Sequence, residues 1–348
     1  MASIRDIAKI AGVSAASVSR ILNEDPTFSI NEQTRVRVIE IANQLNYSVD
    51  KNKRGTRSLG DEMTIALIVR HQVEAELDDP YFRKIRGGIE KEAAKWRFRT
   101  IRAFHMRDAH KEWKELAKYG AVIMISEMTI EATKKIAAIN PNLILVDNYS
   151  NSEEFDCIQT DFQQKTVEVL EVLHRKGHRN IAFIGGHSSR VAENGEVHKS
   201  KEEIRAESYL KWMKLNGLQQ YATVYQGNWK PEDGLRLGKE MLAQQSPPTA
   251  VIVASDPMAV GVYKAISEAN KKIPEDIAVV SFDDIEMAQF MTPSLSSIKA
   301  NPEEMGRLAV RLAKERMLKE RTMPIRVICR SQLVLRDSIG HSSGHSSD

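Results

Sequence analysis

The chain has 348 residues, enough for two or three domains, and its 42% apolar and 28% charged residues describe a soluble globular protein. Its only cysteines, Cys157 and Cys329, argue against a disulfide framework and indicate a reducing compartment. The start of the chain has no apolar signal core, and no apolar run approaches the roughly 20 residues of a membrane span. We therefore expect a cytoplasmic protein with no membrane partner.

The net charge of +3 lies in the first 60 residues, which hold nine Lys or Arg and six Asp or Glu. Lys51, Lys53, Arg54 and Arg57 form a basic cluster near the end of this segment. A basic head on a nearly neutral body favours contact with nucleic acid through the head alone. A solvated charged linker is the alternative interpretation.

Residues 1–47 show the pattern of three short helices. Ser3 and Asp6 resemble a capping box, apolar residues follow at helical spacing, and Gly12 ends the first helix. Ser14 is placed to cap a second helix, and a third begins near Asn31 with an apolar stripe at i, i+3, i+4 and i+7. Two short helices joined by a glycine turn and supported by a third predict a helix-turn-helix unit.

The sequence of this unit resembles that of a known family. "IRDIAKIAGVSAASVSRILN" followed by "TRVRVIEIANQLNY" closely resembles the DNA-binding headpiece of the LacI/GalR family of bacterial repressors. The linker 48–60 departs from the family pattern, because it lacks the Pro-Asn, the Ala-Arg pair and the hinge leucine, and Gly55 weakens a helix. Insertion of this linker into the minor groove stays open, and its basic residues are expected to hold phosphates.

In such a headpiece the second helix enters the major groove with its N-terminal residues against base edges. Arg20 is the expected reader of guanine, with a phosphate contact or a surface salt bridge as the alternative. Ala15 and Ala16 can meet thymine methyl groups but cannot donate hydrogen bonds. The residues expected to contact DNA are Ser3, Ser14, Ala15, Ala16, Ser17, Ser19, Arg20, Asn23, Tyr47, Lys51, Lys53 and Arg54.

From residue 63 onward, apolar strands alternate with helical stretches such as 83–97 and 161–176. The expected strands are "MTIALIV", "AVIMIS", "NLILVDN", "IAFIGG", "TAVIVASD" and "DIAVVSFDD". Near-continuous apolar runs indicate parallel strands buried on both faces, so we predict an α/β body with parallel sheets. Ligands of such sheets bind beyond the carboxyl ends of the strands.

The resemblance to the LacI/GalR family extends over this body, through "DPYFRKIRGGIEKEA", "VLHRKGHRNIAFIGG", "PPTAVIVASDPMAVGVYKAI" and "IPEDIAVVSFDDIEMAQFMTPSLSSIK". It implies an effector and dimerisation domain at 61–337 that is similar to a periplasmic sugar-binding protein, with a first lobe at 61–160 and 290–320 and a second at 161–289 and 321–337. The residues expected to face an effector in the cleft are Tyr81, Phe82, Asp147, Arg205, Trp229, Asp256 and Asp283.

The sequence predicts a repressor without enzymatic activity or a cofactor, bound as a homodimer to palindromic operator DNA and controlled by a small sugar, most similar to repressors of galactoside operons. The alternatives are a regulator responding to a purine or sugar-phosphate corepressor, and a sugar-binding protein without a DNA role. His174 and His178 have no plausible partner ligands, so no metal site is expected. Residues 338–348 are expected to form a disordered tail.

Overall fold

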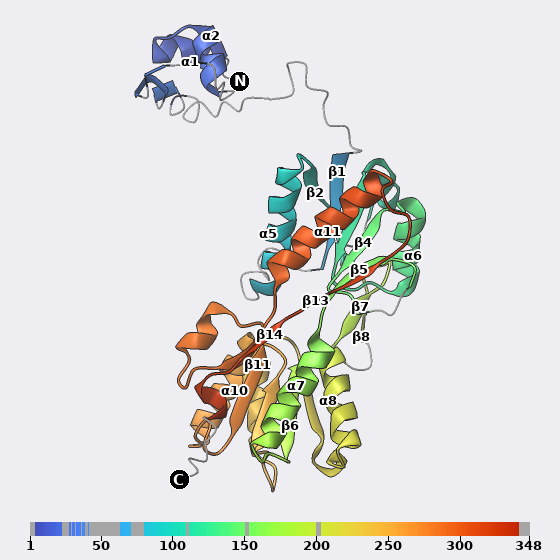
Figure 1. Cartoon of the computed structure of the whole chain (residues 1–348), viewed down its shortest axis with the longest axis vertical. Helices are drawn as coiled ribbons and strands as arrows, with labels where there is room; N and C mark the ends of the chain where they lie inside the picture. The colour runs from blue at the N-terminus through green and yellow to red at the C-terminus, as the bar shows by residue number, and fades with distance from the viewer. Residues whose placement is uncertain are drawn as a thin grey trace, which may run out of the picture. The chain divides into compact units, whose positions relative to one another are not determined.

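The computed structural model describes residues 4–22, 28, 30–31, 33–35, 37–38, 41, 63–70, 80–108, 111–149, 153–199 and 203–340 (Figure 1). The chain divides into two compact units, Met1–Gly60 and Asp61–Asp348. The predicted linker at 48–60 lies outside the described residues. No helix in the described ranges is long and apolar enough to cross a membrane.

The smaller unit contains the predicted helix pair, α1 (Ile4–Ala11) and α2 (Ala15–Leu22). Gly12 has a φ of 68°, and the Val13 amide donates to the Ala8 carbonyl oxygen at 3.1 Å. This hydrogen bond closes the left-handed turn that favours glycine after a helix. The Ser14 hydroxyl accepts a hydrogen bond from the Ser17 amide at 3.0 Å, so the predicted cap of the second helix is confirmed.

Helical residues at 33–35, 37–38 and 41 supply the third side of this unit. Asn31 precedes them, and its side-chain oxygen accepts from the Gln33 amide at 2.8 Å. The small core is apolar throughout and joins all three segments. Its buried members are Ile7, Ala8, Ala11, Val18, Ile21, Val38 and Ile41.

The larger unit contains two six-stranded sheets, as the predicted α/β class requires. The first has the strand order β13-β5-β4-β3-β1-β2, and all of its pairs are parallel. Helices α5 (Pro80–Lys95) and α11 (Pro302–Met317) contribute to the core on one face, and α6 (Ile130–Ile139) to that on the other. Its strands are β1 (Thr64–Val69), β2 (Arg99–His105), β3 (Ala121–Ile125), β4 (Leu143–Val146), β5 (Asp156–Thr160) and β13 (Arg326–Cys329).

The second sheet has the order β14-β12-β11-β10-β6-β9, with only β14 antiparallel to its neighbour. Helices α7 (Phe162–Arg175) and α8 (Ile204–Leu215) pack on one face, and α9 (Pro231–Leu242) and α10 (Asp256–Glu268) on the other. Its strands are β6 (Ile181–Gly186), β9 (Thr223–Gly227), β10 (Ala250–Val253), β11 (Ala278–Phe282), β12 (Ser296–Lys299) and β14 (Gln332–Val334). A short hairpin, β7 (Ser189–Val191) and β8 (Val197–Lys199), follows β6.

The chain crosses between the two lobes after β5, after β12 and after β13 (Figure 1). These crossings correct the predicted lobe boundaries. Residues predicted for the first lobe at 290–299 belong to the second, because β12 pairs with β11. Residues predicted for the second lobe at 321–329 belong to the first, because β13 pairs with β5.

The beginning of the predicted disordered tail is also wrong. Ser338 and Ile339 are buried, and the Ser338 hydroxyl donates to the Val279 carbonyl oxygen at 2.6 Å. The packed chain therefore continues through residue 340. Residues 341–348 lie outside the described part of the chain.

Candidate functional site

The exposed side of α2 carries the residues predicted to read DNA. Ala15, Ala16 and Arg20 are exposed, whereas Val18 and Ile21 are buried against the rest of the unit. The Arg20 guanidinium lies 5.4 Å from the centre of the Phe28 ring, in the geometry of a cation–π contact. A helix whose outer side offers two methyl groups and one planar cation presents little bulk to a groove.

The serines of this helix are partly engaged within the unit. Ser14 Oγ and Ser17 Oγ are 2.9 Å apart, in addition to the capping bond, and Ser19 is half-buried. The DNA contacts of these side chains stay a prediction. The other residues predicted to contact DNA lie outside the described residues: Ser3, Asn23, Tyr47, Lys51, Lys53 and Arg54.

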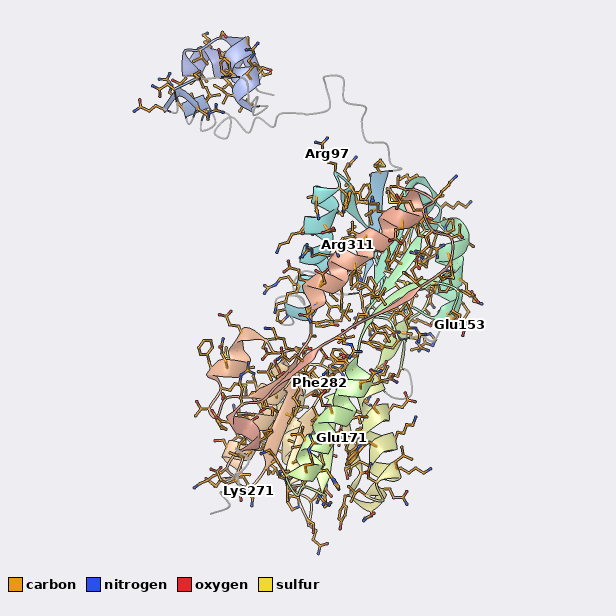
Figure 2. The ribbon with its side chains drawn as sticks, viewed as in Figure 1. Arg97, Glu153, Glu171, Lys271, Phe282 and Arg311 are labelled. Atoms are coloured by element: carbon orange, nitrogen blue, oxygen red, sulfur yellow. The ribbon has the colours of Figure 1, made fainter. Side chains whose placement is uncertain are left out.

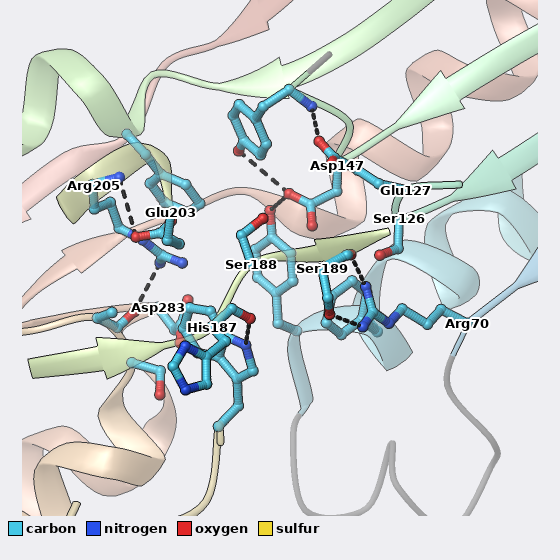
Figure 3. A pocket seen from close by; sticks show the side chains of 17 residues that line it. Arg70, Ser126, Glu127, Asp147, His187, Ser188, Ser189, Glu203, Arg205 and Asp283 are labelled. Carbon is cyan, nitrogen blue, oxygen red and sulfur yellow. Dashed lines mark hydrogen bonds and ion pairs between the residues drawn. The ribbon is translucent and has the colours of Figure 1, made fainter. Parts of the chain in front are cut away.

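The larger unit has a cleft of about 170 Å³ between its two lobes (Figure 3). It lies beyond the carboxyl ends of strands from both sheets, where parallel sheets bind ligands. Aromatic rings and charged groups both line it. The lining residues are Arg70, Tyr81, Phe82, Ser126, Glu127, Asp147, Tyr149, Phe162, His187, Ser188, Ser189, Glu203, Arg205, Trp229, Ala254, Ser255 and Asp283.

Arg205 is held among three aromatic rings of the second lobe. Its guanidinium carbon lies 4.6 Å from the centre of the Phe162 ring, 5.1 Å from that of Trp229 and 5.2 Å from that of Phe282. Contacts with these rings and two hydrogen bonds hold the guanidinium in place. The two hydrogen bonds use only part of its five N–H donors, so donors remain for a ligand.

The hydrogen bonds of Arg205 come from the same lobe. Its Nε donates to Glu203 Oε1 at 2.7 Å, and its Nη1 donates to the Ala254 carbonyl oxygen at 2.7 Å. Figure 3 shows Asp283 pointing toward the guanidinium. Burial lowers the pKa of Arg205, but the Glu203 and Asp283 carboxylates outweigh it and raise this pKa above its usual value.

Asp147 is a charged residue that the first lobe contributes to the cleft. Its Oδ1 accepts hydrogen bonds from the Tyr81 hydroxyl at 3.1 Å and from the Tyr149 hydroxyl at 3.3 Å. Burial raises the pKa of Asp147 to about 6, although Arg205 and the two tyrosine hydroxyls oppose that rise. The carboxylate therefore titrates close to neutral pH, at a point where it faces the cleft.

The cleft carries more negative than positive charge. Four carboxylates line it, those of Glu127, Asp147, Glu203 and Asp283, against the guanidinium groups of Arg70 and Arg205. Each guanidinium is already engaged by protein atoms, Arg70 by Ser189 and Arg205 by Glu203. This balance favours a neutral ligand with several hydroxyl groups over an anion.

Six of the seven residues predicted to face an effector line the cleft: Tyr81, Phe82, Asp147, Arg205, Trp229 and Asp283. Asp256 does not, and its predicted place there is wrong. Its side chain is fully buried, where Oδ1 accepts from the Ser297 hydroxyl and Oδ2 from the Ile285 amide, each at 2.8 Å. Asp256 begins α10 and ties that helix to the strands beside it.

Several lining residues were missed by the sequence analysis. Ser126 and Glu127 directly follow β3, so the rule that strand ends hold ligands should have selected them along with Asp147. Glu203 lies two residues before Arg205, so it could have been selected together with that arginine. His187 and Ser188 directly follow β6, so the same rule points to them as well, whereas the contact of Ser189 with the first lobe has no local signal.

Comparisons with known families match both units. A model described as bacterial regulatory proteins, lacI family, matches residues 3–50. A second model, described as a periplasmic binding protein-like domain, matches residues 170–339. The matches therefore assign the helix-turn-helix to one known type of domain and most of the two-lobed unit to another.

Relatives match over nearly the whole length. The chain is 33% identical over 345 residues to the HTH-type transcriptional repressor MelR of Bacillus subtilis strain 168, covering 98% of each chain. It is 30% identical over 343 residues to the HTH-type transcriptional regulator GalR of Lacticaseibacillus casei, covering 97% of this chain and 99% of the relative. A structure of the Lac repressor dimer bound to operator and the anti-inducer ONPF has the same fold, with a TM-score of 0.68, 21% identity, and coverage of 98% and 99%.

Proposed function

Because the chain belongs to the LacI/GalR family of bacterial transcriptional regulators, we propose that it is a repressor whose affinity for operator DNA is controlled by a small neutral sugar. The sugar would bind in the cleft between the lobes. A homodimer would place two α2 helices on the half-sites of a palindromic operator, since one helix-turn-helix covers only half a site.

The charge and shape of the cleft are the observation that carries this proposal. A flat indole, Trp229, offers a surface for the C–H face of a sugar ring, and it is 36% exposed. Asp147 and Asp283 accept hydrogen bonds from hydroxyls, and Arg205 donates to a ring or hydroxyl oxygen. The cleft is small, about 170 Å³, which favours a compact ligand such as a single sugar ring.

A sugar-phosphate corepressor is the second candidate, and the same observation weighs against it. A phosphate group would enter a cleft lined by four carboxylates and only two guanidinium groups. Repulsion between the phosphate and these carboxylates raises the free energy of the bound anion. A purine is neutral, so the charge of the cleft does not decide against it, and only binding experiments separate it from a sugar.

The test measures DNA binding and effector binding on the full chain. An operator is first selected from random duplexes, and its affinity is measured by fluorescence anisotropy with galactose, melibiose, cellobiose, hypoxanthine and glucose 6-phosphate. We expect a galactose-containing sugar to weaken operator binding, because the sequence resembles repressors of galactoside operons. Equal affinity for selected and random duplexes at physiological salt would overturn the DNA-binding proposal.

Two variants separate the parts of this proposal. Deletion of residues 1–60 should abolish DNA binding and leave sugar binding intact, because the cleft belongs to the other unit. Trp229→Ala should weaken sugar binding at least tenfold and leave operator affinity in the absence of sugar unchanged. A stronger response to hypoxanthine or glucose 6-phosphate than to every sugar would replace the proposed effector class.

A further inference from the structure

The β7–β8 hairpin, residues 189–199, leaves the second lobe and docks on the first. Val191 forms a parallel bridge with Met128, which follows β3 of the first lobe. The Val191 amide donates to the Glu127 carbonyl oxygen at 3.2 Å, and the Thr129 amide donates to the Val191 carbonyl oxygen at 3.0 Å. The hairpin thus adds backbone hydrogen bonds between lobes that the three chain crossings do not supply.

Apolar burial reinforces this docking. The Val191 side chain is fully buried in the apolar cluster of the first lobe that contains Ile68, Phe104 and Met124. Its cross-strand partner in the hairpin, Val197, is 43% exposed. The β7 strand is therefore packed through Val191 into the first lobe's core, whereas the β8 strand is exposed along its length.

Charged groups complete the contact at the tip and along the strand. Arg190 Nε lies 2.9 Å from Glu127 Oε2, and Lys111 Nζ donates to the Glu193 carbonyl oxygen at 2.9 Å. Lys135 of α6 forms an ion pair with the Glu193 carboxylate. All three of the partner residues, Glu127, Lys111 and Lys135, belong to the first lobe.

The root of the hairpin forms one wall of the cleft. His187, Ser188 and Ser189 line it, and Arg70 of the first lobe donates to both the carbonyl oxygen and the hydroxyl of Ser189 (Figure 3). The His187 carbonyl oxygen accepts from Trp229 Nε1 at 3.2 Å. A ligand against the Trp229 ring would lie next to this wall.

The docked hairpin stands away from two of the covalent crossings. The chain leaves the first sheet from β5 and from β13, which occupy one edge of the strand order, whereas the hairpin docks beside the ends of β1 and β3. Two of the covalent connections therefore leave from one edge of the first sheet, and the hairpin docks away from that edge. Figure 1 shows β7 in the space between the two sheets.

We propose that this hairpin limits the size of the effector: docked on the first lobe, it closes the cleft around a single sugar ring and excludes a trisaccharide. The inference rests on the proposed function, since it assigns the ligand class of the same cleft. Undocking removes the wall formed by Ser188 and Ser189 and leaves room for further rings.

The test compares Val191→Asp with Val197→Asp, the same change at a buried position of β7 and at the exposed position paired with it on β8. A carboxylate at 191 cannot enter the apolar cluster, whereas at 197 it stays in solvent. Hydrogen exchange at the Val191 and Thr129 amides reads docking without any ligand, and we expect it to be at least tenfold faster in V191D only. If V191D does not fold, the milder Val191→Ser takes its place.

Sugar binding is then measured by calorimetry with two nested series, galactose, melibiose and raffinose, and glucose, cellobiose and cellotriose. We expect the wild type and V197D to bind a monosaccharide at least tenfold more tightly than the trisaccharide of its series, and V191D to bind both within about threefold. Fast exchange in V191D with unchanged selectivity would overturn the size limit. If the wild type binds no sugar of either series, the proposed sugar effector fails and the size limit with it, while exchange still reports whether the hairpin docks.

Discussion

Lowering the pH from 7 to 5 should weaken sugar binding about tenfold, because Asp147 takes up a proton over this range. Burial raises the pKa of this carboxyl to about 6, so roughly 90% of it is ionised at pH 7 and roughly 10% at pH 5. The ionised form accepts hydrogen bonds at both oxygens, and the protonated form gives up one of these acceptors. Sugar binding favours the ionised form and is therefore lost as the pH falls through 6.

Two variants test whether Asp147 causes this pH dependence. Tyr81→Phe keeps the ring and removes the 3.1 Å hydrogen bond to Asp147. A hydrogen bond to a charged group contributes about 1.5–3 kcal/mol, and 1.4 kcal/mol corresponds to about one unit of pKa. The Tyr149 hydroxyl still donates, so we take the lower figure and expect the midpoint to move from about 6 to about 7. Asp147→Asn should bind more weakly and show no such midpoint.

Calorimetry at pH 5, 6, 7 and 8, with whichever sugar binds the wild type most tightly, measures both midpoints. The effect of Asp147 on folding stability cannot account for weaker sugar binding at low pH. The folded-state pKa of Asp147 lies above its unfolded value, so its contribution favours folding at low pH and is lost as the pH rises through 6. Flat binding between pH 5 and 7 in the wild type, or the same slope in D147N, would refute the assignment to Asp147.

Three further predictions concern other parts of the chain. Asp156→Asn removes a buried charge shared by Arg316, Arg321 and the Ile325 amide, and urea titration should show a loss of about 3 kcal/mol. The exposed-pair control Glu303→Gln should leave the urea midpoint nearly unchanged. Arg20→Ala should cost about 1–3 kcal/mol on the selected operator in anisotropy titrations, and an equal loss on every duplex would indicate a phosphate contact instead. Gly186→Ala would place a methyl group 2.3 Å from the Trp229 ring, so the ring must move and sugar affinity in calorimetry should fall at least tenfold. The melting temperature should stay within about 2 °C, because Trp229 is partly exposed and can move.

Local sequence signals predicted the elements that depend on local causes. All six apolar runs are strands of the two sheets, and the helices expected at 83–97 and 161–176 are α5 (Pro80–Lys95) and α7 (Phe162–Arg175). Ser14 caps α2 because its neighbours in the chain supply the donor. In the cleft, Asp147 and Asp283 were found because strand ends meet at one edge of a parallel sheet.

The missed features depend on partners distant in the sequence. β2 (Arg99–His105) is a half-exposed edge strand with few apolar residues, and β13 is recognisable only through its pairing with β5. Asp256 follows the same strand-end pattern as Asp283, but its hydrogen bonds with Ser297 and Ile285 turn it into the interior. Composition alone does not separate a carboxylate that faces a cleft from one that ties a helix to a sheet.

The late pairing of β13 with β5 has a consequence for synthesis on the ribosome. The first sheet lacks its outer strand until residues 326–329 emerge, which is more than 160 residues after β5 ends. At about 5–20 residues per second, the edge of β5 stays unpaired for on the order of ten to thirty seconds in a nascent chain. An unpaired edge invites association with other strands, so the first lobe is open to such association while the second lobe is being synthesised.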